Sequence, residues 1–236
     1  MKTKLAAAFI LFIFILSGIQ VQAEEQTRKV DQFTSISLRM SAHVQLEQGG
    51  KQNLEIVAKT STLEEIITEV KEGELIIRFP NKNYFLNDFD SGEITIYITV
   101  PEIKRLAVSG SGDIIAEDEI KAKSLDLAVS GSGNITLIEL SAEKVNATIS
   151  GSGSVTLAGK TAAKELSATI SGSGNLKAQD FKADDVNVKV SGSGNVSIEA
   201  SENLNVRVSG SGNVNYKGNP AIDSSISGSG KIRDVN

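Results

Sequence analysis

Apolar and polar residues alternate along most of the chain, in a constant phase relative to a repeated motif. Ser-Gly-Ser-Gly occurs seven times, at intervals of 21, 20, 21, 20, 18 and 18 residues. In five repeats the residues one, three and five positions before the motif are apolar, which is the pattern of a strand with one buried face. These sets are Leu125, Leu127, Val129; Val145, Ala147, Ile149; Leu166, Ala168, Ile170; Val186, Val188, Val190; and Leu204, Val206, Val208. Alternation resumes after each motif, so each repeat predicts a strand, a corner, a second strand and a short polar return.

A repeat of 18–21 residues matches one coil of a β-solenoid, in which each strand pairs with its equivalent one coil away at about 4.8 Å. We therefore expect an all-β fold of seven coils, with glycines allowing tight bends at the corners. The second serine of each motif should form one column, made of Ser111, Ser132, Ser152, Ser173, Ser193, Ser211 and Ser229. Behind it we expect an amide ladder of Asn134, Asn175, Asn195 and Asn213, interrupted by Asp113, Ser154 and Lys231.

The region before the repeats also alternates, but its corners differ. Lys71–Glu74 has the composition of a hairpin turn, and Ser61–Glu64 has the spacing of a capping box, which predicts one helical turn before Ile66. Pro80–Ser91 is the one evident loop excursion. We expect a single domain over residues 24–236, in which irregular coils at about 30–108 cap the regular coils of 109–236.

Residues 1–23 have the features of a secretory signal peptide. Lys2 and Lys4 precede an apolar stretch, Leu5–Leu16, and Val21-Gln22-Ala23 resembles a cleavage site. The stretch is shorter than the roughly 20 apolar residues of a membrane-spanning helix, and no later segment is long enough. We expect an exported protein without a transmembrane segment after cleavage, located in the periplasm or at the cell surface and associated with the outer membrane.

Composition narrows the functional classes. The 236 residues include no Cys, no Trp and 1 His, and the net charge is −5, which becomes −7 if cleavage removes Lys2 and Lys4. No thiol chemistry is available, and an acidic chain does not suit nucleic-acid binding. Few residues are suited to general base catalysis or to stacking on sugars and bases.

Candidate chemical sites are few. His43 is interpreted as a surface or half-buried residue, and the outward column Asp126, Asn146, Asn187 and Asn205 contains no acid cluster of the kind a lyase needs. Gly110–Asp113 has the Gly-x-Gly-Asp pattern of calcium-binding β-rolls, but at twice their period and without an Asp in each turn. The acidic loop 87–93 is the better metal candidate, and we interpret it as a solvated loop. We therefore assign no catalytic, cofactor-binding or metal-binding residue.

The order of the parts resembles a known family. Ile96–Pro101 leads to Leu106–Gly112, and repeated Ser-Gly-Ser-Gly-Asn follows the signal peptide and the alternating β region. This arrangement, over about residues 30–231, is similar to the head GIN domain family of auto-transporter adhesins. The resemblance implies a right-handed, single-stranded β-helix of the pectin-lyase-like kind, an exported protein of Bacteroidetes-type bacteria and a role in cell adhesion, with no catalytic residues to transfer.

Together these observations predict a non-enzymatic binding or scaffolding module that takes a glycan or a protein surface as its ligand. The alternative is a carbohydrate-active enzyme, a polysaccharide lyase or hydrolase-like β-helix, that uses Asp88, Asp90 or Glu93. The last coil carries Lys231, Arg233 and Asp234 at an open strand edge. These charges favour a monomer, and self-association through that edge is the second possibility.

Overall fold

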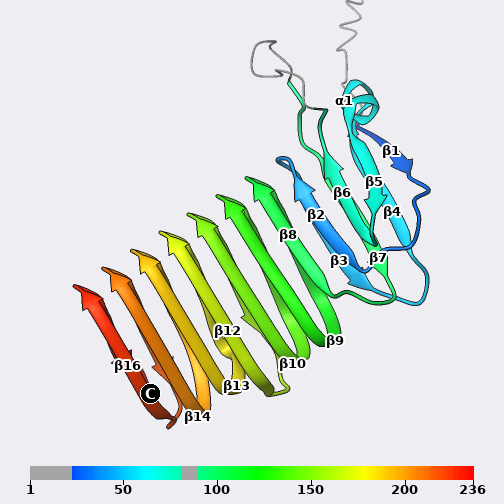
Figure 1. Cartoon of the computed structure of the whole chain (residues 1–236). Coiled ribbons are helices and arrows are strands. Elements are labelled where there is room, and N and C mark those ends of the chain that lie inside the picture. Colours follow the sequence, from blue (N-terminus) through cyan, green and yellow to red (C-terminus); the bar gives the residue numbers. More distant parts are fainter. Residues whose placement is uncertain (1–22, 81–89) are drawn as a thin grey trace, which may run out of the picture.

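The chain folds into a β-solenoid with a capped N-terminal end, as the computed structural model in Figure 1 shows for residues 23–80 and 90–236. The solenoid has about six turns, which lie between the seven Ser-Gly-Ser-Gly corners. The expected all-β solenoid is confirmed, with about six turns rather than seven coils. The predicted signal peptide lies outside the described residues except for Ala23.

Two walls of parallel strands form the solenoid. The strands that enter the corners make the first wall, and the strands that leave them make the second. The longest strands cross both walls and pass through the polar return between them, where the pairing register shifts, as between Leu137 and Glu139. The strands of the solenoid are β8 (Arg105–Gly110), β9 (Asp113–Gly131), β10 (Asn134–Gly151), β11 (Ser154–Ala158), β12 (Ala163–Gly172), β13 (Asn175–Gly192), β14 (Asn195–Gly210), β15 (Asn213–Lys217), β16 (Ala221–Gly228) and β17 (Lys231–Asp234).

The corners stack one above another, as predicted from the repeat. Ser130 pairs with Ser109 and Ser150, and the same register continues to Ser227. At the second corner the Ser132 and Gly133 N–H groups both donate to the Gly110 carbonyl oxygen, each at 2.9 Å, and most later corners repeat the pattern. Each corner is therefore hydrogen-bonded to its predecessor.

The two corner glycines are required for different reasons. The first glycine of every motif has a positive φ, between 118° and 126°, which a residue with a Cβ adopts only with strain. The second glycine has no positive φ, but a Cβ there would clash with the coil before it: at Gly174 it would lie 2.6 Å from the Gly153 carbonyl oxygen. The predicted need for glycine at the tight corners is thus confirmed, through positive φ at the first glycine and through close approach of the preceding coil at the second.

The core lies between the two walls. The predicted apolar columns are buried throughout the regular coils: Leu125, Val145, Leu166, Val186 and Leu204 are all 0% exposed. Phe181, at a return, is also fully buried. The last coil has no neighbour on one side, and there Ile222 and Ile226 are 45% and 40% exposed.

The N-terminal cap ends the parallel stack with antiparallel strands. In the first wall, β2 (Ser35–Arg39) joins β8 to β6 (Glu74–Arg78), and β5 (Ile67–Lys71) pairs antiparallel with β6. In the second wall, β3 (His43–Gln48) joins β9 to β7 (Thr95–Val100), and β4 (Asn53–Lys59) and β1 (Ala23–Thr27) follow, each antiparallel to its neighbour.

Two local predictions in the cap have different outcomes. The Lys71–Glu74 hairpin is confirmed, with Glu72 and Gly73 both at positive φ. The helical turn is confirmed as α1 (Thr60–Glu65), but the capping box is wrong: the N-cap is Lys59, and no side chain caps the helix. The Thr62 hydroxyl instead donates to the Ser91 carbonyl oxygen at 2.8 Å, which ties α1 to the chain that follows the excursion.

Candidate functional site

The single histidine forms one ion pair on the surface of the second wall. His43 begins β3, and its Nδ1 lies 3.3 Å from Asp113 Oδ2 on the next coil; its side chain is 58% exposed. Asp113 thus contacts His43 on one side and accepts a hydrogen bond from Asn134, on the following coil, on the other. Among residues 23–80 and 90–236, no group of three or more His, Cys, Asp or Glu could hold a metal ion.

The acidic loop is only partly described, because Asn87, Asp88 and Phe89 lie outside the described residues. Asp90 pairs with Lys59 Nζ and accepts the Gly92 N–H at 3.0 Å. The Lys59 hydrogen bond, helped by the Gly92 N–H, lowers the pKa of Asp90. A lowered pKa favours a permanent carboxylate, whereas a general acid needs a raised pKa, so the surroundings of Asp90 suit its contacts with Lys59 and Gly92. Glu93 is exposed.

The asparagine columns predicted from the sequence contain hydrogen-bonded ladders. Asn134 donates to Asp113 at 2.8 Å, Asn195 to Asn175 at 3.2 Å, and Asn213 to Asn195 at 3.1 Å. A second ladder runs on the outer side of the first wall, where Asn146 donates to Asp126 at 2.9 Å and Asn205 to Asn187 at 3.1 Å. These bonds hold the side chains one coil apart, so the walls present fixed rows of polar groups.

The outer face of the first wall is polar and shallowly hollowed. Beside the second ladder stand exposed Thr148, Thr169, Lys189 and Arg207. A hollow of about 360 Å³ lies over Asn187, Lys189, Asn205 and Arg207, together with Ser167, Ala168, Thr169 and Val188. Such a face can contact a ligand over several coils.

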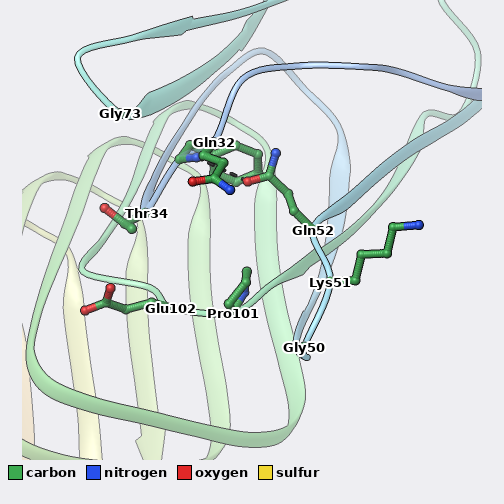
Figure 2. A pocket seen from close by; sticks show the side chains of 9 residues that line it. Gln32, Thr34, Gly50, Lys51, Gln52, Gly73, Pro101 and Glu102 are labelled. Carbon is green, nitrogen blue, oxygen red and sulfur yellow. Dashed lines mark hydrogen bonds between the residues drawn. The ribbon is translucent and has the colours of Figure 1, made fainter.

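A larger groove lies at the junction of cap and solenoid (Figure 2). Its volume is about 480 Å³, and Gln32, Phe33, Thr34, Gly50, Lys51, Gln52, Gly73, Pro101 and Glu102 line it. The Gln52 amide is already engaged, because it accepts the Phe33 N–H at 3.2 Å and donates to the Asp31 carbonyl oxygen at 3.0 Å. The groove is therefore a junction between two chain segments that the Gln52 side chain holds together.

The most charged hollow lies along the return edge of the first coils. Two adjoining hollows, of about 530 and 430 Å³, share Lys121, Ala122, Lys123 and Glu143. We call them together the lysine groove. Its remaining lining residues are Glu102, Ile103, Lys104, Ser124, Asp126, Ser141, Ala142, Lys144, Thr161, Ala162 and Lys164.

Ion pairs within the lysine groove cross between coils. Lys164 Nζ lies 2.7 Å from Glu143 Oε2, and Lys144 Nζ lies 3.1 Å from Glu165 Oε2. The hydrogen bond from Lys164 lowers the pKa of Glu143 and raises that of Lys164. Among the ion pairs of the described residues, none involves Lys123.

Sequence reasoning did not identify the lysine groove, although a signal for it exists. Lys123, Glu143 and Lys164 each stand seven positions before a motif serine. Counting back from the motif beyond the apolar positions would have placed them in one column. Because the returns vary in length, the charged residues of successive coils align only when their positions are counted from the Ser-Gly-Ser-Gly motif.

Comparisons with known proteins agree with this architecture. The family model described as "putative auto-transporter adhesin, head GIN domain" matches residues 32–220. A structure from Bacteroides fragilis, named "putative adhesin", is 26% identical with a TM-score of 0.83, and the alignment covers 91% of this chain and 97% of that one. A structure from Parabacteroides distasonis, named "putative lipid binding protein", is 25% identical with a TM-score of 0.72 and coverage of 92% and 98%.

A structure from Parabacteroides merdae shares the fold at 20% identity, with a TM-score of 0.70 and coverage of 92% and 98%. No curated protein matches the chain. In the described ranges 23–80 and 90–236, no helix is long and apolar enough to cross a membrane. The family match covers most of the chain in the same order of parts that the structure displays. The chain therefore belongs to the head GIN domain family, whose model is described as "putative auto-transporter adhesin".

Proposed function

We propose that the chain is an exported, non-enzymatic binding module that acts in cell adhesion at the bacterial surface or in the periplasm. One observation carries the proposal: fixed, hydrogen-bonded rows of polar side chains extend over successive coils of a regular solenoid. A wall of this kind is preorganised, so it loses little side-chain entropy when it contacts an extended ligand. The names of the family and of the Bacteroides fragilis structure support the same function.

The polar wall implies a mode of binding. Each coil offers a few exposed hydrogen-bonding groups, such as Asn187 and Lys189, and no deep enclosed pocket is needed for such contacts. Affinity then comes from many weak contacts and from several copies of the chain acting together on one surface. Adhesion meets this condition, because a cell carries many copies of its surface proteins.

The alternative of a carbohydrate-active enzyme is less well supported by the geometry. It depends on Asp88, Asp90 or Glu93, and of these Asp90 is held by Lys59 and Gly92 as a low-pKa carboxylate. That environment suits a structural ion pair better than an acid that must exchange protons.

The proposal is tested by deleting the gene and measuring attachment to host matrix, glycan-coated surfaces and sister cells, while the purified chain is assayed on a polysaccharide panel. We expect reduced attachment and no turnover. Reproducible turnover that Asp88→Asn or Asp90→Asn abolishes would establish the enzyme instead. Unchanged attachment to all three surfaces would refute the adhesive role.

A further inference from the structure

Charges alternate along one column of the lysine groove. The strand register places Glu143 one coil after Lys123, between the pairs Ala142–Ala122 and Lys144–Ser124, and Lys164 one coil after Glu143. All three side chains are exposed. Coils are spaced at about 4.8 Å, so Lys123 and Lys164 recur at about 9.6 Å along the solenoid axis. A glutamate lies midway between them.

Short side chains lie between the lysines of the groove. Ala122, Ala142 and Ala162 come from three successive coils; Ala162 is exposed, Ala122 is half-buried and Ala142 is buried. The accessible apolar surface of the groove therefore comes from Ala122, Ala162 and the aliphatic parts of the long lysine side chains. Such a surface with ammonium groups beside it suits the carbon–hydrogen faces of sugar rings with acidic substituents at their edge.

Lysines outnumber acids in the lining of the lysine groove, although the chain as a whole is acidic. Five lysines and three acids line it, two further acids (Glu119 and Glu165) pair with Lys121 and Lys144 from outside the lining, and the net charge of the chain is −5. Exposed ion pairs contribute little net free energy, so an ammonium such as Lys164 can exchange its glutamate for a ligand anion at small cost. Lys123 forms none of the ion pairs found among the described residues, so no direct ion pair has to be exchanged there, although its charge also helps to lower the pKa of Glu143.

We propose that the lysine groove binds an anionic polysaccharide that carries one acidic group per disaccharide and runs along the solenoid axis. The proposal rests on the binding function proposed above and specifies its ligand class. Successive acidic groups accept hydrogen bonds from Lys123 and Lys164, whose separation of two coils, about 9.6 Å, is close to the repeat of an extended disaccharide. The neutral sugar between them lies over Glu143, whose carboxylate repels the acidic groups on either side and competes with them for Lys164.

The test measures binding of the purified chain to three probes: a hyaluronan decasaccharide, a chondroitin sulfate decasaccharide and a neutral N-acetylglucosamine oligomer. We expect both anionic probes to bind, more weakly as salt rises because screening reduces the attraction, and the neutral oligomer not to bind. Hyaluronan carries carboxylates alone, so a response only to chondroitin sulfate identifies sulfate as the recognised anion. Equal binding of all three probes, or of none, would overturn the proposal.

Variants locate the site. The double variant Lys123→Gln with Lys164→Gln should bind hyaluronan at least about tenfold more weakly, which corresponds to ~1.4 kcal/mol. The matched control is Lys177→Gln with Lys182→Gln, which removes two exposed lysines outside the groove and outside the polar hollow of the first wall and should leave affinity unchanged. Circular dichroism and melting temperature verify that each variant is folded. Equal losses in both double variants would show general attraction to lysines and contradict a site.

Glu143→Gln separates a binding role from a purely structural ion ladder. If the groove binds polyanions, removing this carboxylate abolishes repulsion and releases Lys164, so hyaluronan should bind more tightly although the chain loses an ion pair. Unchanged or weaker binding would contradict the proposal. Attachment of the deletion strain is independent of these results: a chain that binds hyaluronan while the strain attaches normally refutes adhesion only, and lost attachment without polyanion binding refutes the groove only.

Discussion

Four glycines allow backbone strain and close packing to be measured separately. Three of them, Gly110, Gly172 and Gly174, lie in corners, and Gly50 outside the corners is the reference. At Gly110, φ is +123° and nothing lies within 4 Å of an added Cβ. At Gly172, φ is +118° and the Cβ would lie 2.6 Å from the Gly151 carbonyl oxygen. Gly174 has the clash without the positive φ, and Gly50 has neither. Each is replaced by alanine.

The expected costs follow from these geometries. Gly110→Ala should lose about 1–3 kcal/mol of unfolding free energy to strain, partly offset by the ~0.4–1 kcal/mol that alanine gains by restricting the unfolded chain. Gly172→Ala should lose a further ~1–3 kcal/mol, because the preceding coil must shift to accept the methyl group. Gly174→Ala should lose only the packing contribution, and Gly50→Ala should be neutral or slightly stabilising.

Thermal and denaturant unfolding provide the assay. A domain of this size changes its melting temperature by about 2–4 °C per kcal/mol, so Gly172→Ala and Gly110→Ala should differ by at least about 2 °C. Equal melting temperatures for these two variants would refute the claim that corner-to-corner contact limits the residue at this position. A Gly50→Ala variant as unstable as Gly174→Ala would refute the assignment of the clash.

Position along the stack supplies a further comparison with valine. Gly228 has a φ of +126° and an added Cβ would lie 2.3 Å from the Gly210 carbonyl oxygen, so its local geometry resembles that of Gly172. Only β17 lies beyond Gly228, whereas Gly172 has coils on both sides. Gly172→Val should therefore destabilise the fold by several kcal/mol more than Gly228→Val, and equal melting temperatures would contradict the stacked arrangement.

Three further predictions concern side chains. Phe181→Ala should destabilise the chain by about 3–5 kcal/mol in denaturant unfolding, because a fully buried ring is lost from the core; a loss under ~1 kcal/mol would contradict its packing. Asn195→Ala should cost about 0.5–1.5 kcal/mol, since Asn175 and Asn213 lose their shared partner, and an unchanged denaturation midpoint would mean that solvent replaces the ladder. NMR titration should find the pKa of Glu143 below its ordinary value and Lys164→Gln should raise it. The glutamate's stabilising contribution is present above its ordinary pKa and lost as pH falls through the lowered one, and that of Lys164 is lost as pH rises through its raised pKa; an unchanged Glu143 pKa in the variant would exclude this pair.

The repeat made the solenoid predictable because one motif fixed three features at once. Ser-Gly-Ser-Gly marked the corner, set the phase of the buried positions and aligned equivalent residues such as Asn195 and Asn213. Each coil repeats the environment of its neighbour, so a column inferred from spacing becomes a column in space. The ladder hydrogen bonds followed from the same alignment.

The cap was less predictable because alternation is the same in parallel and antiparallel strands. Nothing in the pattern of β4 indicates that it pairs antiparallel with β7, since no repeated motif sets its register. The capping box failed for a related reason: Ser61–Glu64 has the correct spacing, but helix α1 begins at Thr60, so the serine is inside the helix. The Thr62 hydroxyl is engaged by the chain at Ser91, a tertiary contact that local spacing does not encode.

The candidate site was less predictable than the solenoid and more predictable than the cap. A constant offset from the motif relates Lys123, Glu143 and Lys164. Their charges alternate in sign, however, so the amino-acid composition of the returns does not reveal a basic segment. The groove forms because long side chains surround the short Ala122, Ala142 and Ala162. Which long and short side chains become neighbours depends on how the returns stack.

The most direct test of the account is attachment of the deletion strain to a surface coated with hyaluronan after complementation with three versions of the gene. The wild type and the Lys177→Gln/Lys182→Gln control should restore attachment, and the folded, equally expressed Lys123→Gln/Lys164→Gln variant should not. Equal attachment by all three complemented strains and by the uncomplemented deletion strain would contradict both the adhesive role and its assignment to the lysine groove.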